Sequence, residues 1–559
     1  IVGALLITFL LLIDSKTQRD SGRTFLNFNA FVISCLIISV VYDFTLHYHT
    51  WVSVLISLFL LLGVVGVFVI VLAEAHEWAE AMWYSGRRRL LSRPKGAKAD
   101  AITASGYQPF VSIHVPAYEE PPEMLIDTLN ALARLDYPNF EVIVIDNNTK
   151  DEATWRPVQA HCLQLDQSPD KRFRFFHVSP LSGYKAGALN FALERTSPQA
   201  EVVAVIDADY KVLPGWLSDL APEFEKPQIA IVQAPQDYRD GQESAFKSLC
   251  YAEYKGFFHL GMVTRNERNA IIQHGTMTMV RRSVLEQVGC WGVSTITEDT
   301  ELGLRIFEQG HEAVYIDQSY GHGLIPDTFT DYKKQRHRWA YGAMQILREH
   351  AGQLFGFKRS KLTAGQRYHF VSGWLPWIAD GINLVFTLLA LVWSGLMLHD
   401  PVGFNAPPLL ISVVPIMFFT FKIAKLFTLY LVQVKASFGT ALAATLAGLS
   451  LSYAIGRATL SGLFVGRKIP FIRTPKMANR MALLNAVNAA RDESVLALVL
   501  LCAVGLIYFQ LGFDSKENLA WCLVLVSQSL PFAAAFVVSL VSAAPARAAA
   551  HNEMGVKQS

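Results

Sequence analysis

The chain has 559 residues, of which 52% are hydrophobic, 12% are aromatic and only 17% are charged, and its formal net charge is +2. The apolar residues gather toward the two ends of the chain, which excludes an ordinary soluble domain and indicates a polytopic protein of the lipid bilayer. Lys and Arg form no dense stripe outside short clusters beside the apolar segments, so we expect no nucleic-acid partner.

Three apolar segments open the chain, at 1–13, 27–45 and 51–74. The last two are long enough to cross about 30 Å of hydrocarbon as helices. The first is too short, and because the sequence starts with Ile1 inside this run, we expect a missing N-terminal region. We assign residues 1–75 to N-terminal transmembrane helices, about three with the first truncated, and residues 76–104 to a basic juxtamembrane linker.

Basic residues set the expected orientation through the positive-inside rule. Lys16, Arg19 and Arg23 lie between the first two segments, the loop 45–50 has no Lys or Arg, and Arg87–Arg89 follow the third segment. The middle of the chain is therefore predicted to be cytoplasmic, with the N-terminal end outside.

Five further apolar segments follow, at 374–397, 408–432, 439–465, 494–512 and 519–542. The segment 439–465 is rich in small and hydroxyl residues, and the positive-inside rule leaves no crossing for it, so we predict an interfacial or re-entrant helix and seven spans. Eight plain spans are the alternative that hydropathy alone favours. The expected regions are interfacial helices at 332–372, two transmembrane helices at 373–435, the interfacial or re-entrant helix at 436–466, two transmembrane helices at 494–542 and a cytoplasmic tail at 543–559.

Residues 105–331 alternate short β-branched apolar runs with helical stretches. This pattern predicts a cytoplasmic α/β domain with a largely parallel sheet, inserted between the transmembrane segments. Ligands of such sheets bind beyond the carboxyl ends of the strands. The expected strands, each ending in polar residues, are Phe110–Val115, Glu141–Ile145, Phe173–Val178, Val202–Ile206 and Ile229–Gln233.

Carboxylates follow three of these strands: Glu120 comes after the first, Asp146 after the second, and Asp207 and Asp209 after the fourth. Carboxylates crowded in one crevice repel one another unless a cation or a hydrogen-bonded substrate offsets that cost. An Asp-x-Asp pair after a strand suits Mg²⁺ or Mn²⁺ held together with substrate phosphate oxygens. Asp-rich turns without a metal are the common alternative.

Three more motifs have both a structural and a functional interpretation. In Ser182–Gly187, Lys185 and the backbone N–H groups of a helix start could together bind an anion. The structural alternative is a loop with an exposed lysine. Thr297–Asp299 precedes an amphipathic helix and equally fits a simple capping motif. Arg338 and Trp339 suit a diphosphate and a stacked sugar, or belong to the charged and aromatic belt of the next span.

Taken in chain order, four motifs resemble the D, DxD, TED and QxxRW signature of the processive family 2 glycosyltransferases, which include cellulose, curdlan, chitin and hyaluronan synthases. The resemblance covers roughly residues 105–480 and implies a GT-A domain. The matching residues are Asp146, Asp207-x-Asp209, Thr297-Glu298-Asp299 and Gln335-x-x-Arg338-Trp339.

The resemblance implies a role for each matching residue. Asp299 is expected to be the catalytic base, and Glu298 and Trp339 are expected to contact the acceptor. Asp207 and Asp209 are expected to hold the metal, Mg²⁺ or Mn²⁺. The residues implied for nucleotide-sugar binding are Tyr118, Glu120, Asp146, Lys185, Asp207 and Arg338.

Residues 467–482 look like the family's gating loop, whose pattern is FxVTxK. Arg473 stands here in place of the usual valine, while Thr474 and Lys476 match and are expected to reach the nucleotide diphosphate.

Within the family, the stretches 183–190 and 273–277 look most similar to bacterial β-1,3-glucan synthases of the nodule-development and curdlan type. The resemblance implies an enzyme of the bacterial inner membrane that takes UDP-glucose, inverts the anomeric centre and moves a nascent β-glucan through its own channel. A β-1,4-glucan or GlcNAc-containing polymer is the nearest alternative. A nucleotide-sensing transporter and a non-processive transferase acting on a lipid carrier are the others. The tail is too short for a PilZ domain, so no cyclic-di-GMP regulation through this chain is expected.

Overall fold

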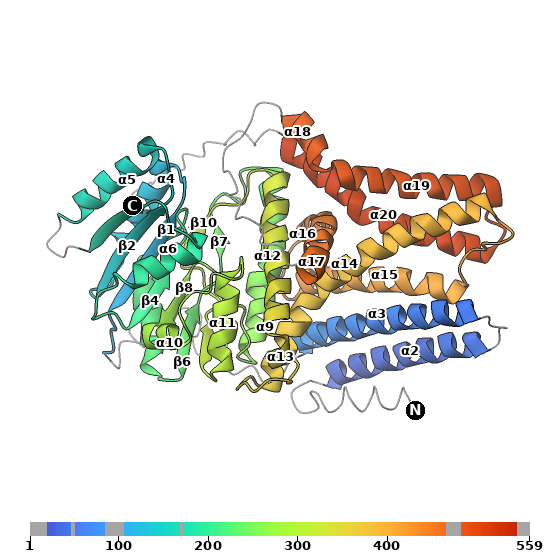
Figure 1. The fold of residues 1–559 in the computed structure, drawn as a ribbon, viewed down its shortest axis with the longest axis horizontal. Helices are drawn as coiled ribbons and strands as arrows, with labels where there is room; N and C mark the ends of the chain where they lie inside the picture. The colour runs from blue at the N-terminus through green and yellow to red at the C-terminus, as the bar shows by residue number, and fades with distance from the viewer. Residues whose placement is uncertain (1–19, 46–50, 84–105, 168–171, 466–481, 545–559) are drawn as a thin grey trace, which may run out of the picture.

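The computed structural model describes residues 20–45, 51–83, 106–167, 172–465 and 482–544. An α/β domain lies at one end of an elongated molecule and a bundle of long helices lies at the other (Figure 1). Helix α12 (Phe329–Glu349) stands between the two parts and runs across the axis of the bundle.

A seven-stranded sheet forms the centre of the α/β domain, with the strand order β3-β2-β1-β4-β8-β6-β9. In β2, Val142 and Val144 pack into the core on one face of the sheet, whereas Ile143 and Ile145 pack on the other. A continuous apolar run is what a strand covered on both faces requires. The strands are β1 (Val111–Ala117), β2 (Phe140–Asn147), β3 (Phe173–Val178), β4 (Val202–Val205), β6 (Ile229–Gln233), β8 (Thr278–Arg281) and β9 (Glu312–Tyr315).

All five predicted strands are present, two of them with the predicted bounds. The sheet is largely parallel, as predicted, and it is mixed only because β8 runs antiparallel to both β4 and β6. A second sheet has the order β5-β10-β7. Strands β8 and β9 and this small sheet were not predicted, because these short segments lack the continuous apolar run that marks β4. The small sheet comprises β5 (Lys211–Val212), β7 (Asp237–Tyr238) and β10 (Gly321–Gly323).

Helices cover both faces of the main sheet. In α4, Leu125, Leu129 and Leu132 recur at helical spacing and are buried with the β1 side chains of one face. On the other face, α6 and α11 pack against β4. The helices of the domain are α4 (Pro122–Leu132), α5 (Glu152–Leu165), α6 (Tyr184–Leu193), α7 (Trp216–Leu220), η3 (Ala221–Glu225), α8 (Ala245–Gly256), η4 (Phe257–Gly261), α9 (Met262–Asn266), α10 (Arg282–Gln287) and α11 (Glu298–Glu308).

Five helical segments within the described part of the chain are long and apolar enough to cross a membrane: Ser21–Ser39, Ala364–His399, Ser412–Val432, Arg491–Leu511 and Lys516–Ala543. They identify a protein with several candidate spans, as predicted. The elements outside the α/β domain, besides α12, are α2 (Asp20–Thr45), α3 (Trp51–Trp83), α13 (Ala351–Leu354), α14 (Ala364–His399), α15 (Leu409–Val432), α16 (Phe438–Ser450), α17 (Ser452–Phe464), α18 (Ala482–Ala489), α19 (Arg491–Leu511) and α20 (Lys516–Ala543).

The segment predicted to be interfacial or re-entrant forms α16 and α17, which are bent by 41° relative to one another. Figure 1 shows both helices between α12 and the long helices, and they run across the bundle rather than along it. The total of seven spans stays a prediction, because residues 1–19 and the side chains of residues 51–65 lie outside the described part.

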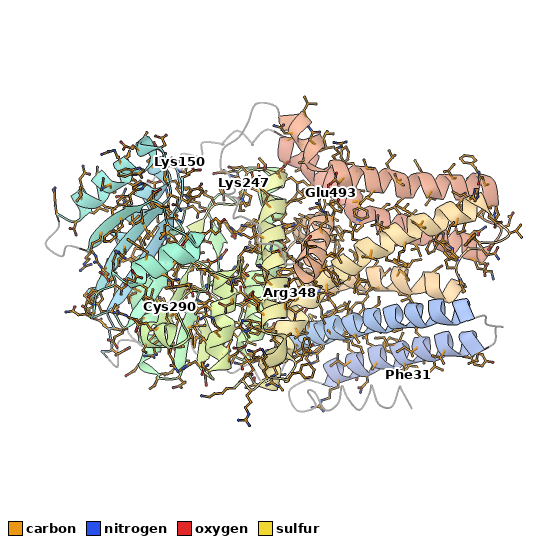
Figure 2. The ribbon with its side chains drawn as sticks, in the orientation of Figure 1. Phe31, Lys150, Lys247, Cys290, Arg348 and Glu493 are labelled. Atoms are coloured by element: carbon orange, nitrogen blue, oxygen red, sulfur yellow. The ribbon has the colours of Figure 1, made fainter. Side chains whose placement is uncertain are left out.

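Helix α12 is tied to the long helix α19 near its start and to α17 near its end (Figure 2). Lys333 Nζ donates to Glu493 Oε1 of α19 at 2.6 Å, and Glu493 is almost fully buried. Arg348 Nη1 donates to the carbonyl oxygen of Gly462 in α17 at 2.9 Å. The helix that carries the predicted Arg338 and Trp339 is therefore fixed against the membrane part of the molecule.

A buried set of ion pairs makes a second connection between the two parts. Arg265 of α9 pairs with Glu77 of α3 at 3.1 Å, and Arg268 pairs with Glu80 at 3.0 Å. Lys425 of α15 pairs with the same Glu77 at 3.0 Å. Because breaking one partner of such a set leaves an uncompensated buried charge, the domain is held in one orientation on the helices.

Candidate active site

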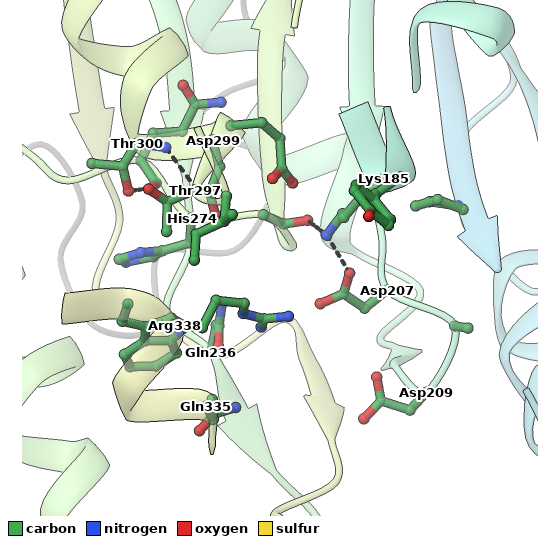
Figure 3. A pocket seen from close by; sticks show the side chains of 18 of the residues that line it. Lys185, Asp207, Asp209, Gln236, His274, Thr297, Asp299, Thr300, Gln335 and Arg338 are labelled. Carbon is green, nitrogen blue, oxygen red and sulfur yellow. Dashed lines mark hydrogen bonds and ion pairs between the residues drawn. The ribbon is translucent and has the colours of Figure 1, made fainter. Parts of the chain in front are cut away.

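A cavity of about 380 Å³ lies beyond the carboxyl ends of β1, β2 and β4, between the α/β domain and helices α12 and α14. This is the position at which open α/β sheets bind their ligands. Figure 3 shows Lys185 and Asp207 on one wall of the cavity and Asp299 and Arg338 facing them. The predicted site residues that line it are Tyr118, Glu120, Lys185, Asp207, Asp209, Glu298, Asp299, Arg338 and Trp339.

Lys185 is placed by the tight turn that starts α6. The N-terminal cap, Gly183, has a φ of +88°, which is a left-handed conformation that glycine adopts without strain. Lys185 Nζ donates to Asp207 Oδ1 at 2.5 Å and to the Gly275 carbonyl oxygen at 2.8 Å. Burial opposes the ammonium charge, but Asp207, Glu298 and Asp299 outweigh it and raise the pKa of Lys185. The cavity therefore holds a permanent cation at the start of a helix, where anions bind favourably.

Asp207 and Asp209 follow β4 in a turn that the neighbouring loops fix. Asp207 N donates to Thr276 Oγ1 at 3.0 Å, and Asp209 Oδ2 accepts from Leu324 N at 2.9 Å. The Asp207 side chain keeps 38% of its surface exposed. Across the described residues, no three His, Cys, Asp or Glu side chains form a metal cluster. Two carboxylates at one strand end do fit Mg²⁺ or Mn²⁺, since such ions take their remaining ligands from phosphate and water.

Glu298 and Asp299 form the first turn of α11. Asp299 Oδ1 accepts from Thr300 N at 2.7 Å. Burial, with repulsion from Asp299, raises the pKa of Glu298 to about 7. Burial also raises the pKa of Asp299, although Lys185 opposes that shift. Two neighbouring carboxyl groups with raised pKa values can hold and exchange a proton near neutral pH, which general acid–base catalysis requires.

The segment before Asp299 is attached along one face of α12. Ser294 Oγ donates to Glu349 Oε2 at 3.1 Å, and Ile296 N donates to Gln345 Oε1 at 3.2 Å. One turn closer to Trp339, Thr297 lies against Gly342. The α12 positions recur at intervals of three or four residues, so they share one face of the helix. This seam sets where Asp299 lies relative to Trp339.

Trp339 is held in place by a buried guanidinium group. The Arg336 guanidinium carbon lies 4.5 Å from the Trp339 ring centroid, and Arg336 is paired with Glu253 of α8. The rings of Tyr254 and Phe257 lie 6.4 and 6.5 Å from the same indole. A cation over one side and rings around it fix the indole plane, as a platform for a sugar ring requires.

Asp146 lies behind the cavity rather than on its wall. Its carboxylate accepts from Thr149 Oγ1 at 2.8 Å and lies 2.8 Å from His177 Nδ1. Thr149 Oγ1 in turn accepts from Glu119 N at 2.9 Å, next to Glu120. The adjacent Asn147 and Asn148 line the cavity instead. In this structure Asp146 therefore supports the cavity wall, and its predicted contact with the nucleotide stays a prediction.

Predicted residues from five separate stretches of the chain thus meet at one cavity. The predicted Thr474 and Lys476 fall in residues 466–481, outside the described part. Several lining residues were not predicted, above all Phe257 of η4 and Trp374 and Trp377 of α14. The two tryptophans stand three positions apart at the start of a long apolar helix, a spacing that places them on one helix face. That spacing is the signal that would have found them.

Two family models match the chain. The model described as glycosyl transferase family 2 matches residues 112–289, and the model described as glycosyl transferase family group 2 matches residues 202–432. Both matches agree with the GT-A α/β domain and its mixed sheet, which is flanked by helices able to span a membrane. The chain is thus similar to family 2 glycosyltransferases over these residues.

The curated relatives include plant enzymes. The chain is 26% identical over 337 residues to a probable glucomannan 4-β-mannosyltransferase of Arabidopsis thaliana, over 59% of this chain and 56% of the relative. A similar protein of Oryza sativa is 26% identical over 52% of this chain and 50% of its own. The chain thus spans about half the length of the curated relatives it matches.

Among solved structures, the chain resembles the mannosyltransferase PcManGT from Pyrobaculum calidifontis in complex with GDP-Man and Mn²⁺. The superposition covers 72% of this chain and 99% of the PcManGT chain, with 17% sequence identity and a TM-score of 0.45. The superposition on the TarS protein of S. aureus covers 45% of this chain and 44% of the TarS chain, with 18% sequence identity and a TM-score of 0.29.

Proposed function

We propose that the protein is a processive, inverting glycosyltransferase that polymerises a hexose from a nucleotide sugar and passes the product into its own transmembrane helices. The observation that carries this proposal is the single cavity in which Lys185, Asp207, Asp299 and Trp339 meet beside the membrane part of the molecule.

The geometry supports a direct displacement. The nucleoside diphosphate lies along Lys185 and Arg338, and the end of the growing glycan lies on Trp339. The acceptor hydroxyl oxygen attacks the anomeric carbon while Asp299 takes its proton, and the bond from that carbon to the diphosphate oxygen breaks. The diphosphate leaves with the electron pair, and the cations beside it stabilise its charge. Attack opposite the leaving group inverts the anomeric centre.

Asp207 and Asp209 are the residues that would hold a divalent ion, Mg²⁺ or Mn²⁺, beside the diphosphate. A bound ion there supplies further neutralisation of the leaving group. Lys185 keeps its own role in that state, because its ammonium contacts Asp207 from the side of the α6 turn.

Processivity is supported by the aromatic end of the cavity. Trp339, Trp374, Trp377 and Phe257 line it between the reacting groups and the long helices. A sugar chain stacked on such rings stays bound between additions. Helix η4, which carries Phe257, is a single π-helical turn, a feature that recurs at functional sites.

For the sugar we propose UDP-glucose and a β-glucan product, with β-1,3 the favoured linkage, in an enzyme of the bacterial inner membrane whose GT-A domain faces the cytoplasm. A second candidate is transfer of mannose with β-1,4 linkage, favoured by the names of the plant relatives.

The test is a donor panel with purified protein in detergent and Mg²⁺. UDP-glucose should yield UDP and a polymer that a β-1,3-glucanase degrades. Product from GDP-mannose alone, degraded by a β-mannanase, would replace the first candidate with the second.

Asp299→Asn should abolish transfer while leaving donor binding intact, and exposed Glu286→Gln on α10 is its control. Donor hydrolysis or polymer synthesis by Asp299→Asn at the wild-type rate would overturn the proposed mechanism.

A further inference from the structure

A cluster of ionisable groups joins α11 to the end of α12 that is remote from the cavity. His350 follows the last residue of α12 and is 8% exposed. Its Nδ1 lies 2.8 Å from Glu308 Oε1, and its Nε2 lies 3.5 Å from Glu301 Oε1. Both carboxylates belong to α11, the helix that begins with Glu298 and Asp299. Since both ring nitrogens face acceptors, the imidazole is doubly protonated and bridges the two helices.

We propose that His350 is a positioning residue for glycosyl transfer: its imidazolium closes the seam between α11 and α12 and thereby fixes the base Asp299 relative to the acceptor platform Trp339. This inference rests on the proposed function. The seam has contacts along its whole length, from Gly342 and Thr297 beside the cavity, through Gln345 and Glu349, to His350 at its far end.

His350 supplies the fully ionic contact of this seam. Beside the cavity, the charge of Arg338 on α12 acts on Glu298 and Asp299. Apolar side chains of α11 and α12 share one buried cluster, and the hydrogen bonds of Ser294 and Ile296 to α12 complete the seam. Charge-assisted hydrogen bonds are about twice as strong as neutral ones. Loss of the imidazolium charge therefore removes the charge-assisted link between α11 and the end of α12 and leaves the apolar contacts of the two helices to hold their relative position. A displacement of about 1 Å between reacting groups can lower a rate by about a hundredfold.

The charged groups around His350 explain why it keeps its proton. Glu301 and Glu308 face it from α11, where Arg305 also binds Glu301, with Nε–Oε1 and Nη2–Oε2 distances of 2.6 and 2.8 Å. Arg348 and Glu349 precede it on α12, and Lys361 N binds the Glu308 carbonyl oxygen. Burial opposes the positive charge, but hydrogen bonds to Glu301 and Glu308 outweigh burial and raise the pKa of His350 to about 9.

The direction of the pH effect follows from this shift. A histidine whose pKa is raised above its ordinary value of 6.5 on folding contributes its full stabilisation below that value. The contribution is lost as the pH rises from 6.5 toward about 9, where the folded protein releases the proton. The alkaline limb of the pH profile should therefore report this seam.

The experiment compares the kcat pH profiles of full-length wild type, His350→Gln and His350→Lys in detergent. Wild type should lose activity with an apparent pKa near 9. His350→Gln should lower kcat by about tenfold or more at neutral pH, remove the alkaline limb and leave the donor KM unchanged. His350→Lys should restore most of the activity and move the limb to higher pH, because lysine carries a fixed charge to about pH 10. His161→Gln on α5, where the ring contacts Asn130, is the matched control.

The outcomes separate this inference from the proposed function. Absence of transfer by wild type with every donor would defeat the proposed function itself. An active wild type whose alkaline limb is shared by His350→Gln would overturn the role of His350. Equal losses of activity in the Gln and Lys variants, with no shift of the limb, would also overturn it. Thermal unfolding monitored by tryptophan fluorescence shows that each variant is folded.

Discussion

Gly342 of α12 lies directly against Thr297, which begins the Thr297-Glu298-Asp299 motif. A Cβ atom at Gly342 would lie 2.3 Å from Thr297 Oγ1 and 2.6 Å from its Cγ2. This contact places the motif one helical turn from Trp339 on α12. Glycine is therefore required here for the close approach of two segments, and not for a backbone conformation.

Gly342→Ala is expected to push the two segments apart. Overpacking of this kind destabilises a protein by about 1–3 kcal/mol, and the displaced Asp299 should lower kcat more than donor KM. Transfer rates and fluorescence melting curves measure both effects. The control is Gly448→Ala on α16, where a Cβ would meet no atom within 4 Å. Equal activity in Gly342→Ala and wild type would show that the contact does not position the base.

The Glu298–Asp299 pair predicts the acid limb of the pH profile. Because the base acts in its ionised form, a raised pKa moves the onset of activity to higher pH than an ordinary aspartate gives. Folding favours the protonated pair, so its contribution to the free energy of unfolding declines as the pH rises from 4.5 toward about 7.

Glu298→Gln tests this assignment, because repulsion between neighbouring carboxylates acts on both groups. The acid limb of kcat should move to lower pH in the variant. A limb that stays in place would mean that Asp299 does not titrate with Glu298, and a limb that moves upward would contradict the pairing. Asp166→Asn, after α5, serves as the remote control.

Much of the fold follows from local sequence pattern. The apolar runs at 142–145 and 229–233 determine strands buried on both faces, and their polar ends correctly indicated the edge at which the cavity lies. The antiparallel β8 was missed because its four residues match no period, and its direction depends on partners distant in sequence. The prediction of a largely parallel sheet is confirmed apart from this one strand.

In the site, too, local sequence motifs indicated some residues, whereas others depend on contacts between segments far apart in the sequence. Asp299, Lys185 and Trp339 were found through motifs whose chemistry is local. The contacts of Gly342 and His350 were not predicted, because no spacing in the sequence reveals that these residues meet α11 or the segment before it. Asp146 was placed at the correct strand end, but its orientation toward His177 depends on the neighbouring strand β3.

Lys185→Gln is expected to lower kcat by about 10²–10³-fold, the usual effect of removing one group that stabilises charge at the leaving atom. The substitution also frees Asp207 from its 2.5 Å partner. Steady-state kinetics with saturating Mg²⁺ measures the loss, and exposed Lys150→Gln is the control. A change confined to donor KM would assign Lys185 to ground-state binding alone.

Trp377 should control product length rather than the rate of each transfer. Its ring lines the cavity on the side of the long helices, beyond the groups that act on the donor. Removing it in Trp377→Ala should shorten the polymer while UDP release per enzyme stays within about threefold of wild type, since stacking contributes about 1 kcal/mol to holding a sugar. Trp339→Ala should instead remove the polymer, because in the proposed mechanism that ring holds the attacking end of the glycan. Trp393→Ala, farther along the same helix and hydrogen-bonded to the Asn405 carbonyl oxygen, is the control. Size-exclusion profiles of radiolabelled product distinguish these cases, and full-length polymer from Trp377→Ala would place the exit path elsewhere.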